Sequence, residues 1–300
     1  MKPKLRDILE QFRVVPGKRV KLAEHDPAWA GDRRVPKAER KELAKQVLTQ
    51  DVTKLCQAQE LLYASDTHSI LLVFQAMDAA GKDGTIKHVM SGINPQGCQV
   101  YSFKKPSAEE LDHDFLWRCA RVLPERGRIG IFNRSYYEEV LVVKVHPEYL
   151  KLAQLPVLKF GKQFWSERYD SINNFERHLT QNGTTVIKFF LNVSKKEQRK
   201  RFLERIEDPN KRWKFSVADL AERGHWDDYM RAYEEALIAT STKWAPWYIV
   251  PADNKWVTRA SVAAIIVNTI ESLDMHYPKI TAEGLKHIAA AKLQLEKERD

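Results

Sequence analysis

Residues 69–85 read SILLVFQAMDAAGKDGT, and this stretch decides the fold. Its first part, 70–74, is an unbroken apolar run, typical of a strand buried on both faces of a parallel sheet. Small residues then lead to Gly81-Lys82, and beyond Gly84 apolar residues recur at three- and four-residue spacing, which predicts a helix. A buried strand, a small-residue loop with a lysine and the start of a helix are the layout of a phosphate-binding P-loop.

The loop departs from the usual P-loop pattern, G-x-x-x-x-G-K-[ST]. Ala76 stands at the first glycine and Asp83 at the hydroxyl residue, whereas Gly81-Lys82 is intact. The helix N-terminus and the backbone N–H groups offer partial positive charge, and Lys82 adds a full charge. We therefore predict that phosphate binds to the residues of this loop: Ala79, Ala80, Gly81, Lys82, Asp83 and Gly84.

Asp78 lies inside the same loop. An ordinary strand–turn–helix connection is the simplest alternative to a P-loop. In a loop that binds anions, however, a carboxylate repels phosphate, so Asp78 makes sense if a metal ion or an acceptor group must be held beside the phosphates. Asp78 is therefore predicted to be catalytic and to bind a metal ion.

Length and composition limit the classes of protein. The chain has 300 residues and 43% hydrophobic content, enough for one large α/β domain with extensions or for two small domains. No apolar stretch approaches the roughly 20 residues of a membrane span, and the N-terminus lacks the apolar segment of a secretory signal. Three scattered cysteines without a C-x-x-C pair fit a reducing cytoplasm and argue against disulfides and a zinc site.

The chain is basic, with 49 Lys and Arg residues against 40 Asp and Glu residues and a formal net charge of +9. This balance suggests a polyanionic partner: nucleic acid, an acidic membrane surface or a phosphate-rich substrate. A basic cytosolic enzyme whose charges are simply solvated is the alternative.

Strands alternate with helices along the chain. Apolar runs predict strands at 70–74, 98–103, 128–133, 184–191 and 247–250. Helical periodicity and caps predict helices at 37–63, 107–122, 136–145, 161–181, 194–207, 257–273 and 281–297. This order predicts a doubly wound α/β fold with a parallel sheet, whose ligands bind beyond the carboxyl ends of the strands. Residues 1–36, basic and broken by prolines, are expected to form an extended arm.

A second polar group, NRSYYEE at 133–139, follows the third strand. P-loop enzymes usually have an aspartate there that holds Mg²⁺, but here Asn133 takes that place, with Arg134 beside it. Both are predicted to be catalytic, and the metal would then depend on the loop aspartate and on Glu138 or its neighbour. Helix capping by Asn133 or Ser135 is the alternative, and it does not exclude catalysis.

A basic segment at 207–226, EDPNKRWKFSVADLAERGHW, comes late in the fold. Nucleotide kinases with a P-loop have a mobile lid at this place, which brings cations over the transferring phosphoryl group and excludes water. Arg212 and Lys214 are the predicted lid residues. A solvated basic turn is the alternative.

Further cations are candidates for a track that binds a long polyanion. Arg118 and Arg121 lie at i, i+3 on one predicted helix, and Lys104 and Lys105 follow the second strand. For the arginine pair, an ordinary solvated face is the alternative. Nine histidines are present, and His88 follows the loop, but none lies in a charged glycine-rich context, so a phosphohistidine intermediate is not expected.

Three ordered motifs carry a resemblance to a known family: FQAMDAAGKDG at 74–84, FNRSYY at 132–137 and DPNKRWKFS at 208–216. Together they resemble the second family of polyphosphate kinases, the polyphosphate:nucleotide phosphotransferases, over about residues 40–275. The resemblance implies a three-layer α/β/α P-loop kinase fold like that of thymidylate kinase, with a five-stranded parallel sheet and a helical lid. It also implies transfer of the terminal phosphate of inorganic polyphosphate to AMP or ADP, and back, with Mg²⁺ or Mn²⁺.

Two residues depart from the common family pattern: Ala76 stands where most members have Gly, and Asn133 where many have Asp. The segment 133–143 resembles the branch often called class III, which accepts both AMP and ADP. We expect a basic arm at 1–36, a phosphotransferase domain at 37–280 with its lid at 207–226, and a C-terminal helix at 281–300.

The resemblance implies direct in-line transfer without a covalent enzyme intermediate. The P-loop amides and Lys82 would hold the end of polyphosphate, Arg134 would contact the transferring oxygens, and the lid cations would close over them. The implied partners are polyphosphate, adenine nucleotides and further copies of the chain, as a dimer or tetramer through the helix at 37–63. Nucleic acid and membranes are not expected partners, and the expected location is the cytoplasm.

Two other functions stay open at this point. An ATP-dependent kinase of thymidylate-kinase type is the nearer one, although such enzymes more often keep the full P-loop pattern. A nucleic-acid-binding protein is the other, and it requires base-stacking aromatic residues on an exposed sheet. Aromatic pairs such as Phe189-Phe190 and Trp247-Tyr248 lie in strands that a doubly wound fold buries, so core packing explains them more simply.

Overall fold

The computed structural model describes residues 9–156 and 159–298, and its centre is a five-stranded sheet in which every neighbouring pair is parallel. The strand order is β2-β3-β1-β4-β5. The strands are β1 (Ser69–Gln75), β2 (Cys98–Ser102), β3 (Ile129–Asn133), β4 (Thr184–Asn192) and β5 (Trp247–Pro251). The predicted five-stranded parallel sheet is confirmed.

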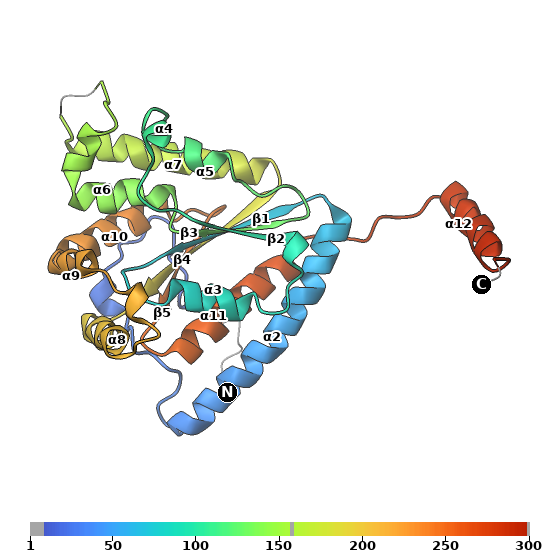
Figure 1. The fold of residues 1–300 in the computed structure, drawn as a ribbon, viewed down its shortest axis with the longest axis horizontal. Coiled ribbons are helices and arrows are strands. Elements are labelled where there is room, and N and C mark those ends of the chain that lie inside the picture. Colours follow the sequence, from blue (N-terminus) through green and yellow to red (C-terminus); the bar gives the residue numbers. More distant parts are fainter. Residues whose placement is uncertain (1–8, 157–158, 299–300) are drawn as a thin grey trace.

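Helices cover both faces of the sheet and so complete the three layers (Figure 1). One layer holds α2 (Lys37–Ser65), α3 (Lys82–Val89) and α11 (Lys255–Glu271), and the other holds α6 (Val142–Val145), α7 (Lys162–Gln181) and α10 (Trp226–Thr240). The remaining elements are α4 (Ala108–Leu111), α5 (Trp117–Ala120), α8 (Lys195–Glu207), α9 (Val217–Gly224), α12 (Ala282–Leu295) and the 3-10 turns η1 (Leu22–Glu24), η2 (Pro95–Gly97), η3 (Tyr136–Val140), η4 (Pro147–Lys151) and η5 (Arg212–Lys214).

The central strands form the core. All seven residues of β1 are buried, as expected for a strand between two helical layers. Phe189, Phe190, Trp247 and Tyr248 are buried as well. Core packing therefore accounts for these four aromatic residues, which offer no exposed surface for base stacking.

The described part of the predicted N-terminal arm packs against the domain. Phe12 and Val14 are buried beside β5, where the Ile249 N–H donates to the Phe12 carbonyl at 2.7 Å and the Val14 N–H donates to the Trp247 carbonyl at 2.9 Å. Arg13 and Tyr248 form an antiparallel bridge. The segment thus covers an edge of the sheet that would otherwise expose unpaired backbone groups.

Two predicted helices are interrupted, and that part of the prediction was wrong. In place of one helix at 107–122, α4 ends near Asp112, and α5 begins after Asp114, whose carboxylate accepts the Leu116 N–H at 2.9 Å. In place of one helix at 136–145, η3 and α6 are separated at Leu141, whose ψ of −81 is outside the helical range. Local side-chain bonds and tight turns compete with helix propagation at both places.

Helix α10 was missed. Its buried residues recur at helical spacing: Trp226, Tyr229, Ala232, Tyr233, Ala236, Leu237 and Thr240. This periodicity was visible in the sequence and was overlooked beside the lid motif. The helix packs against α7 and α6, so it supports the wall of the site described below.

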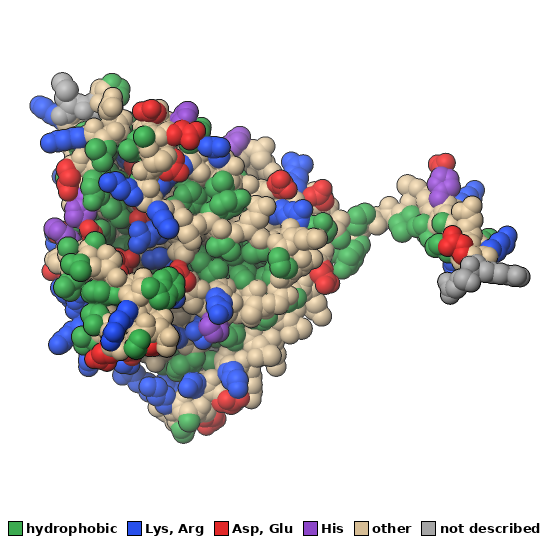
Figure 2. All heavy atoms as spheres, viewed as in Figure 1, with side chains coloured by type: hydrophobic (Ala, Val, Ile, Leu, Met, Phe, Trp, Pro, Cys, Tyr) green, Lys and Arg blue, Asp and Glu red, His purple; other side chains and the backbone are tan. Residues whose placement is uncertain are grey.

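Helix α12 begins at the predicted cap, where Thr281 accepts the Gly284 N–H at 3.1 Å. It stands away from the three layers (Figure 1), and every residue from 276 to 298 except Gly284 is exposed. Figure 2 shows Lys and Arg side chains gathered around α8 and α9. Within the described ranges no helix is long and apolar enough to cross a membrane.

Candidate active site

The phosphate loop joins β1 to α3 in a compact turn. Gly81 has φ +105 and Ala79 has φ 59, so the loop uses the left-handed region at two positions. Lys82 is the first residue of α3, and its Nζ donates to the Ala76 carbonyl at 2.9 Å. Burial lowers the pKa of Lys82, and Arg134 lowers it further, whereas neighbouring carboxylates oppose the change. The lysine is therefore a buried cation folded back on its own loop, and it is poised to exchange a carbonyl for phosphate oxygens.

Helix α8 holds the carbonyl side of this loop. The Arg201 guanidinium donates to the carbonyls of Ala79 (3.0 Å) and Ala80 (2.7 Å), and also to that of Ala252 (2.6 Å) after β5. The Gln198 amide donates to the Asp78 carbonyl at 2.9 Å. Sequence reasoning missed both residues, because nothing in the pattern of α8 shows which side chains turn toward the loop.

Asp78, Arg134 and Glu138 form a line of alternating charges at the centre of the site. Arg134 contacts the Asp78 carboxylate at 2.9 Å and the Glu138 carboxylate at 3.7 Å. Its φ of 65 turns the backbone sharply at the end of β3. Burial raises the pKa of Glu138 despite the opposing charges of Arg134 and Lys82, and Glu138 in turn raises the pKa of Arg134. The arginine is thus a fixed cation beside the phosphate loop.

Asn133 links the ends of three neighbouring segments. Its amide donates to the Asp83 carboxylate on α3 at 2.8 Å, and it also lies 3.4 Å from the Ser102 hydroxyl at the end of β2. Ser135, not Asn133, caps the following turn by accepting the Tyr137 N–H at 3.1 Å. Asn133 therefore orients Asp83 at the N-terminus of α3.

A buried polar network anchors the turn that follows. The Tyr136 and Tyr137 hydroxyls donate to the Glu176 carboxylate at 2.9 Å and 2.8 Å. Lys188 completes the network with a 2.5 Å ion pair to Glu176, and both members of the pair are fully buried. Because these partners come from η3, α7 and β4, the network fixes the segment that carries Arg134 and Glu138.

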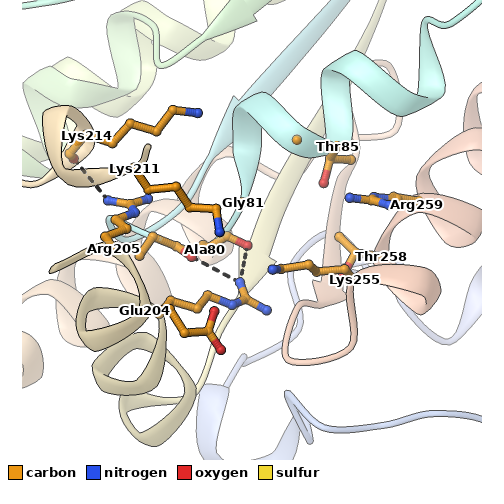
Figure 3. A pocket seen from close by; sticks show the side chains of 13 residues that line it. Ala80, Gly81, Thr85, Glu204, Arg205, Lys211, Lys214, Lys255, Thr258 and Arg259 are labelled. Carbon is orange, nitrogen blue, oxygen red and sulfur yellow. Dashed lines mark hydrogen bonds between the residues drawn. The ribbon is translucent and has the colours of Figure 1, made fainter. Parts of the chain in front are cut away.

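A cationic pocket lies on one side of the loop (Figure 3). Its volume is about 210 Å³. Arg205 of α8, Lys214 of η5 and Lys211 in the turn before η5 face it from one side. Lys255 and Arg259 face it from α11, across Gly81. We call this the first pocket; Glu204 is its one carboxylate. Its walls offer charge and little apolar surface for a base.

A second pocket of about 310 Å³ is lined by Arg134. Its other charged lining residues are Lys104, Lys105, Glu110, Asp114, Arg118, Glu138, Glu139 and Arg168. Its apolar lining residues come from α4, α6, η4 and the loops beside α5 and η4: Leu111, Phe115, Val142, Val143, Leu150, Leu152, Ala153 and Leu155. The pocket thus offers both ionic groups and apolar surface.

Most of the predicted site residues lie at the phosphate loop, beside Arg134 or in one of the pockets, and two lie elsewhere. Arg118 is buried at the second pocket, where it donates to the Lys104 carbonyl at 2.9 Å. Arg121 lines neither pocket and lies over the Trp117 ring at 4.5 Å. Arg212 also lines neither pocket, and its Nε donates to the Ile206 carbonyl at 2.8 Å. Lys214 faces the first pocket as part of the basic segment.

Asp78 and Glu138 are the carboxylates available to a divalent metal ion. Mg²⁺ is usually held by one or two carboxylates together with substrate phosphate oxygens. Residues 9–156 and 159–298 contain no cluster of three or more His, Cys, Asp or Glu side chains suited to a metal. The donor set therefore fits an ion held largely by its phosphate substrate, whose charge would favour the ionised form of the buried Glu138.

A parallel sheet with a lysine-bearing loop after β1 and two pockets at its carboxyl edge defines a P-loop phosphotransferase. The sequence profile of the family Polyphosphate kinase 2 (PPK2) matches residues 38–278, and the chain belongs to this family. It is thus a phosphotransferase, and the family assignment favours polyphosphate as phosphate donor over the ATP-dependent alternative. Kinases of this kind use a divalent metal ion.

Known relatives agree with this assignment. The chain is 56% identical over 287 residues to the ADP-polyphosphate phosphotransferase of Rhodopseudomonas palustris, covering 95% of this chain and 98% of that protein. It is 45% identical to the AMP/ADP-polyphosphate phosphotransferase of Meiothermus ruber, covering 90% and 96%. The crystal structure of polyphosphate kinase 2 from Arthrobacter aurescens superposes with a TM-score of 0.83 at 38% identity, covering 94% and 96%.

Proposed function

We propose that this protein transfers the terminal phosphate of inorganic polyphosphate to both AMP and ADP, with Mg²⁺ as the preferred ion and Mn²⁺ as a substitute. The observation that carries the proposal is the contrast between the two pockets, one lined by the phosphate loop and the other by Arg134. A chain of phosphates needs cations only, whereas a nucleotide needs cations at one end and an apolar surface for its base at the other.

The first pocket is the proposed donor site. Lys211, Lys214, Lys255 and Arg259 would pair with successive phosphates, and the phosphate loop with Lys82 would hold the terminal ones. Arg205 already donates to the Lys214 carbonyl at 3.4 Å, so the two sides of the basic segment are linked. The proposed lid would close these cations over polyphosphate.

The second pocket is the proposed acceptor site. Its cations, among them Lys104 and Arg118, would bind the phosphates of AMP or ADP, and its apolar side chains would hold the base beside Phe115. Several cations can pair with one phosphate or with two, which supports acceptance of both AMP and ADP.

The proposed step is an in-line displacement at the end phosphorus of polyphosphate. A terminal phosphate oxygen of the nucleotide forms the new P–O bond while the bond from that phosphorus to the bridging oxygen of polyphosphate breaks, and the shortened chain leaves with the bonding electron pair. Arg134, held between Asp78 and Glu138, would stabilise the transferring oxygens. Asp78 and Glu138 would hold the metal ion, which neutralises charge on the phosphates when bound.

The direct test is an incubation with Mg²⁺, long-chain polyphosphate and AMP, without ATP, followed by separation of the nucleotides. ADP and ATP should both appear. If AMP stays unchanged but a second incubation with ADP gives ATP, the family reaction is retained and the proposal that both nucleotides are acceptors is refuted. No product from either acceptor would refute polyphosphate as the donor for these nucleotides. The same sample, analysed by light scattering, tests the proposed dimer or tetramer.

A further inference from the structure

The last turn of α9 contacts the wall of the second pocket. The Glu222 carboxylate lies 2.9 Å from His146 Nε2 and accepts the Tyr229 hydroxyl at 2.5 Å. His146 ends α6, whose Val142 and Val143 line that pocket. Both the imidazole and the carboxylate are largely buried, at 14% and 29% side-chain exposure.

The neighbouring residue on α9 points to the opposite side. Arg223 donates to the Gln198 side-chain oxygen at 2.7 Å and to the Lys195 carbonyl at 2.8 Å, both on α8. Gln198 is almost fully buried, and its amide donates to the Asp78 carbonyl in the phosphate loop at 2.9 Å. One turn further along α8, Arg201 holds the two following carbonyls of the loop.

Consecutive residues of one helix therefore join the two pockets. The path runs from the α6 wall through His146 to Glu222, along the backbone to Arg223, and through Gln198 to the phosphate loop. Figure 1 shows α9 lying with α10 on one side and α8 on the other. Every side-chain link in the path is 2.9 Å or shorter.

We infer that Glu222 and Arg223 are positioning residues that couple the two pockets, so that polyphosphate in the first pocket raises the affinity of the second for the acceptor nucleotide. This inference rests on the proposed function for the identity of the two substrates. Donor binding restrains the phosphate loop and α8, Arg223 then restrains α9, and Glu222 keeps its bond to the α6 wall. The nucleotide meets a wall that is already ordered, and it no longer bears the free-energy cost of ordering it.

The physical basis is the serial arrangement of the bonds. A rigid helix turn carries both contacts, so breaking either one disconnects the pockets. Two independent structural contacts would instead have additive effects. Coupling in series thus predicts that the loss of Glu222 and the loss of Arg223 have the same effect, and that the double variant adds nothing to either one.

The test is the KM for AMP, measured from initial rates at polyphosphate concentrations far below and far above saturation. In the wild-type protein we expect the KM for AMP to fall at least about fivefold as polyphosphate saturates, the lower end of typical coupling between sites. In Glu222→Gln, in Arg223→Met and in the double variant the ratio should drop to within about twofold of unity. Arg223→Lys, which keeps one donor for Gln198, should restore part of it.

Glu148→Gln is the matched control. Glu148 lies 3.3 Å from the other nitrogen of the same histidine, but its side chain is 60% exposed and it belongs to η4, not to α9. This variant should keep the wild-type ratio. Thermal unfolding of each variant separates a change in coupling from a loss of folded protein.

Two results would overturn the inference: a wild-type KM for AMP that does not respond to polyphosphate, or α9 variants that keep the full wild-type ratio. A wild-type protein that forms no ADP from AMP and polyphosphate is a different outcome, because it refutes the proposed function itself.

Discussion

The phosphate loop lines the first pocket and Arg134 lines the second, and the two pockets differ in their other walls. Lysine and arginine side chains from α8, α11 and the segment at 211–214 line the first. The second combines such cations with many apolar side chains. In the proposed assignment this difference lets one P-loop fold discriminate a polyanion from a nucleotide, since the wall and not the loop decides what else the ligand must carry.

The largest effect is expected at the lysine of the phosphate loop, the loop that borders the first pocket. Lys82→Ala removes the one lysine of the phosphate loop, a buried cation. Its loss should raise the activation barrier by about 3–4 kcal/mol, the scale for removing one preorganised charge-stabilising donor, and so lower kcat roughly 100- to 1,000-fold. The rate of ATP formation from ADP and polyphosphate measures this. Near-normal turnover would refute the assignment of the loop.

A smaller and selective effect is expected in the second pocket. Phe115→Ala removes a ring from the apolar lining of this pocket. It should raise the KM for AMP by about tenfold, because about 1.5 kcal/mol of apolar contact is lost. The KM for polyphosphate should not change. Phe164→Ala is the control, because both rings lie against the Arg168 guanidinium, at 4.7 Å and 4.9 Å, but Phe164 does not line the pocket. Equal changes in both variants would mean that Phe115 acts by packing against Arg168 and not by contacting the base.

The reverse selectivity is expected in the first pocket. Lys255→Gln removes one of several cations there, and it should raise the KM for polyphosphate about fivefold, from about 1 kcal/mol, the Coulomb energy of two unit charges about 4 Å apart in water, with the KM for AMP unchanged. The effect should shrink at high salt because exposed charges are screened. Lys196→Gln, an exposed lysine of α8 outside the pocket, is the control. Equal losses in both variants would point to diffuse attraction over the surface in place of a site.

Local patterns predicted the framework of this site well. The run at 70–74 predicted the central strand, and Gly81-Lys82 predicted the loop and helix that follow it, because each feature depends on neighbouring residues alone. Asp78, Asn133 and Arg134 were predicted from their places after two strands, and the sheet brings those strand ends together. The predicted lid and the roles of these residues stay predictions.

The sequence could not show which side chains of distant helices turn inward. Arg201, Gln198, Lys255 and Arg259 lie on helices whose basic residues are mostly solvated, and only the packing of α8 and α11 against the loop selects them. Arg121 illustrates the opposite error. Spacing placed it beside Arg118, but the break between α4 and α5 turns it toward Trp117, away from either pocket.

The smallest expected effect lies at Glu138, which lines the second pocket and contacts Arg134. Burial raises the pKa of this carboxyl above its ordinary value of 4.5, so the folded protein binds its proton more tightly than the unfolded chain does. The stability that the protonated form contributes is present at low pH and is lost as pH rises through the folded-state pKa. At pH 7–8 the ionised carboxylate therefore costs stability, and in the proposed mechanism the same charge holds Arg134 and the metal ion.

Glu138→Gln replaces that carboxylate with a neutral side chain of the same shape. At pH 8 the variant should unfold a few degrees higher than the wild type, the scale of about 1 kcal/mol in a protein of this size, and the difference should shrink as pH falls toward 5. Phosphate transfer should be slower at every pH. Glu235→Gln, which neutralises a half-exposed carboxylate, should shift the unfolding temperature by less than about 2 °C throughout. If Glu138→Gln unfolds at a lower temperature than the wild type at pH 8, the ion pair with Arg134 outweighs the cost of burial. The charge of Glu138 would then stabilise the fold as well as serve the reaction.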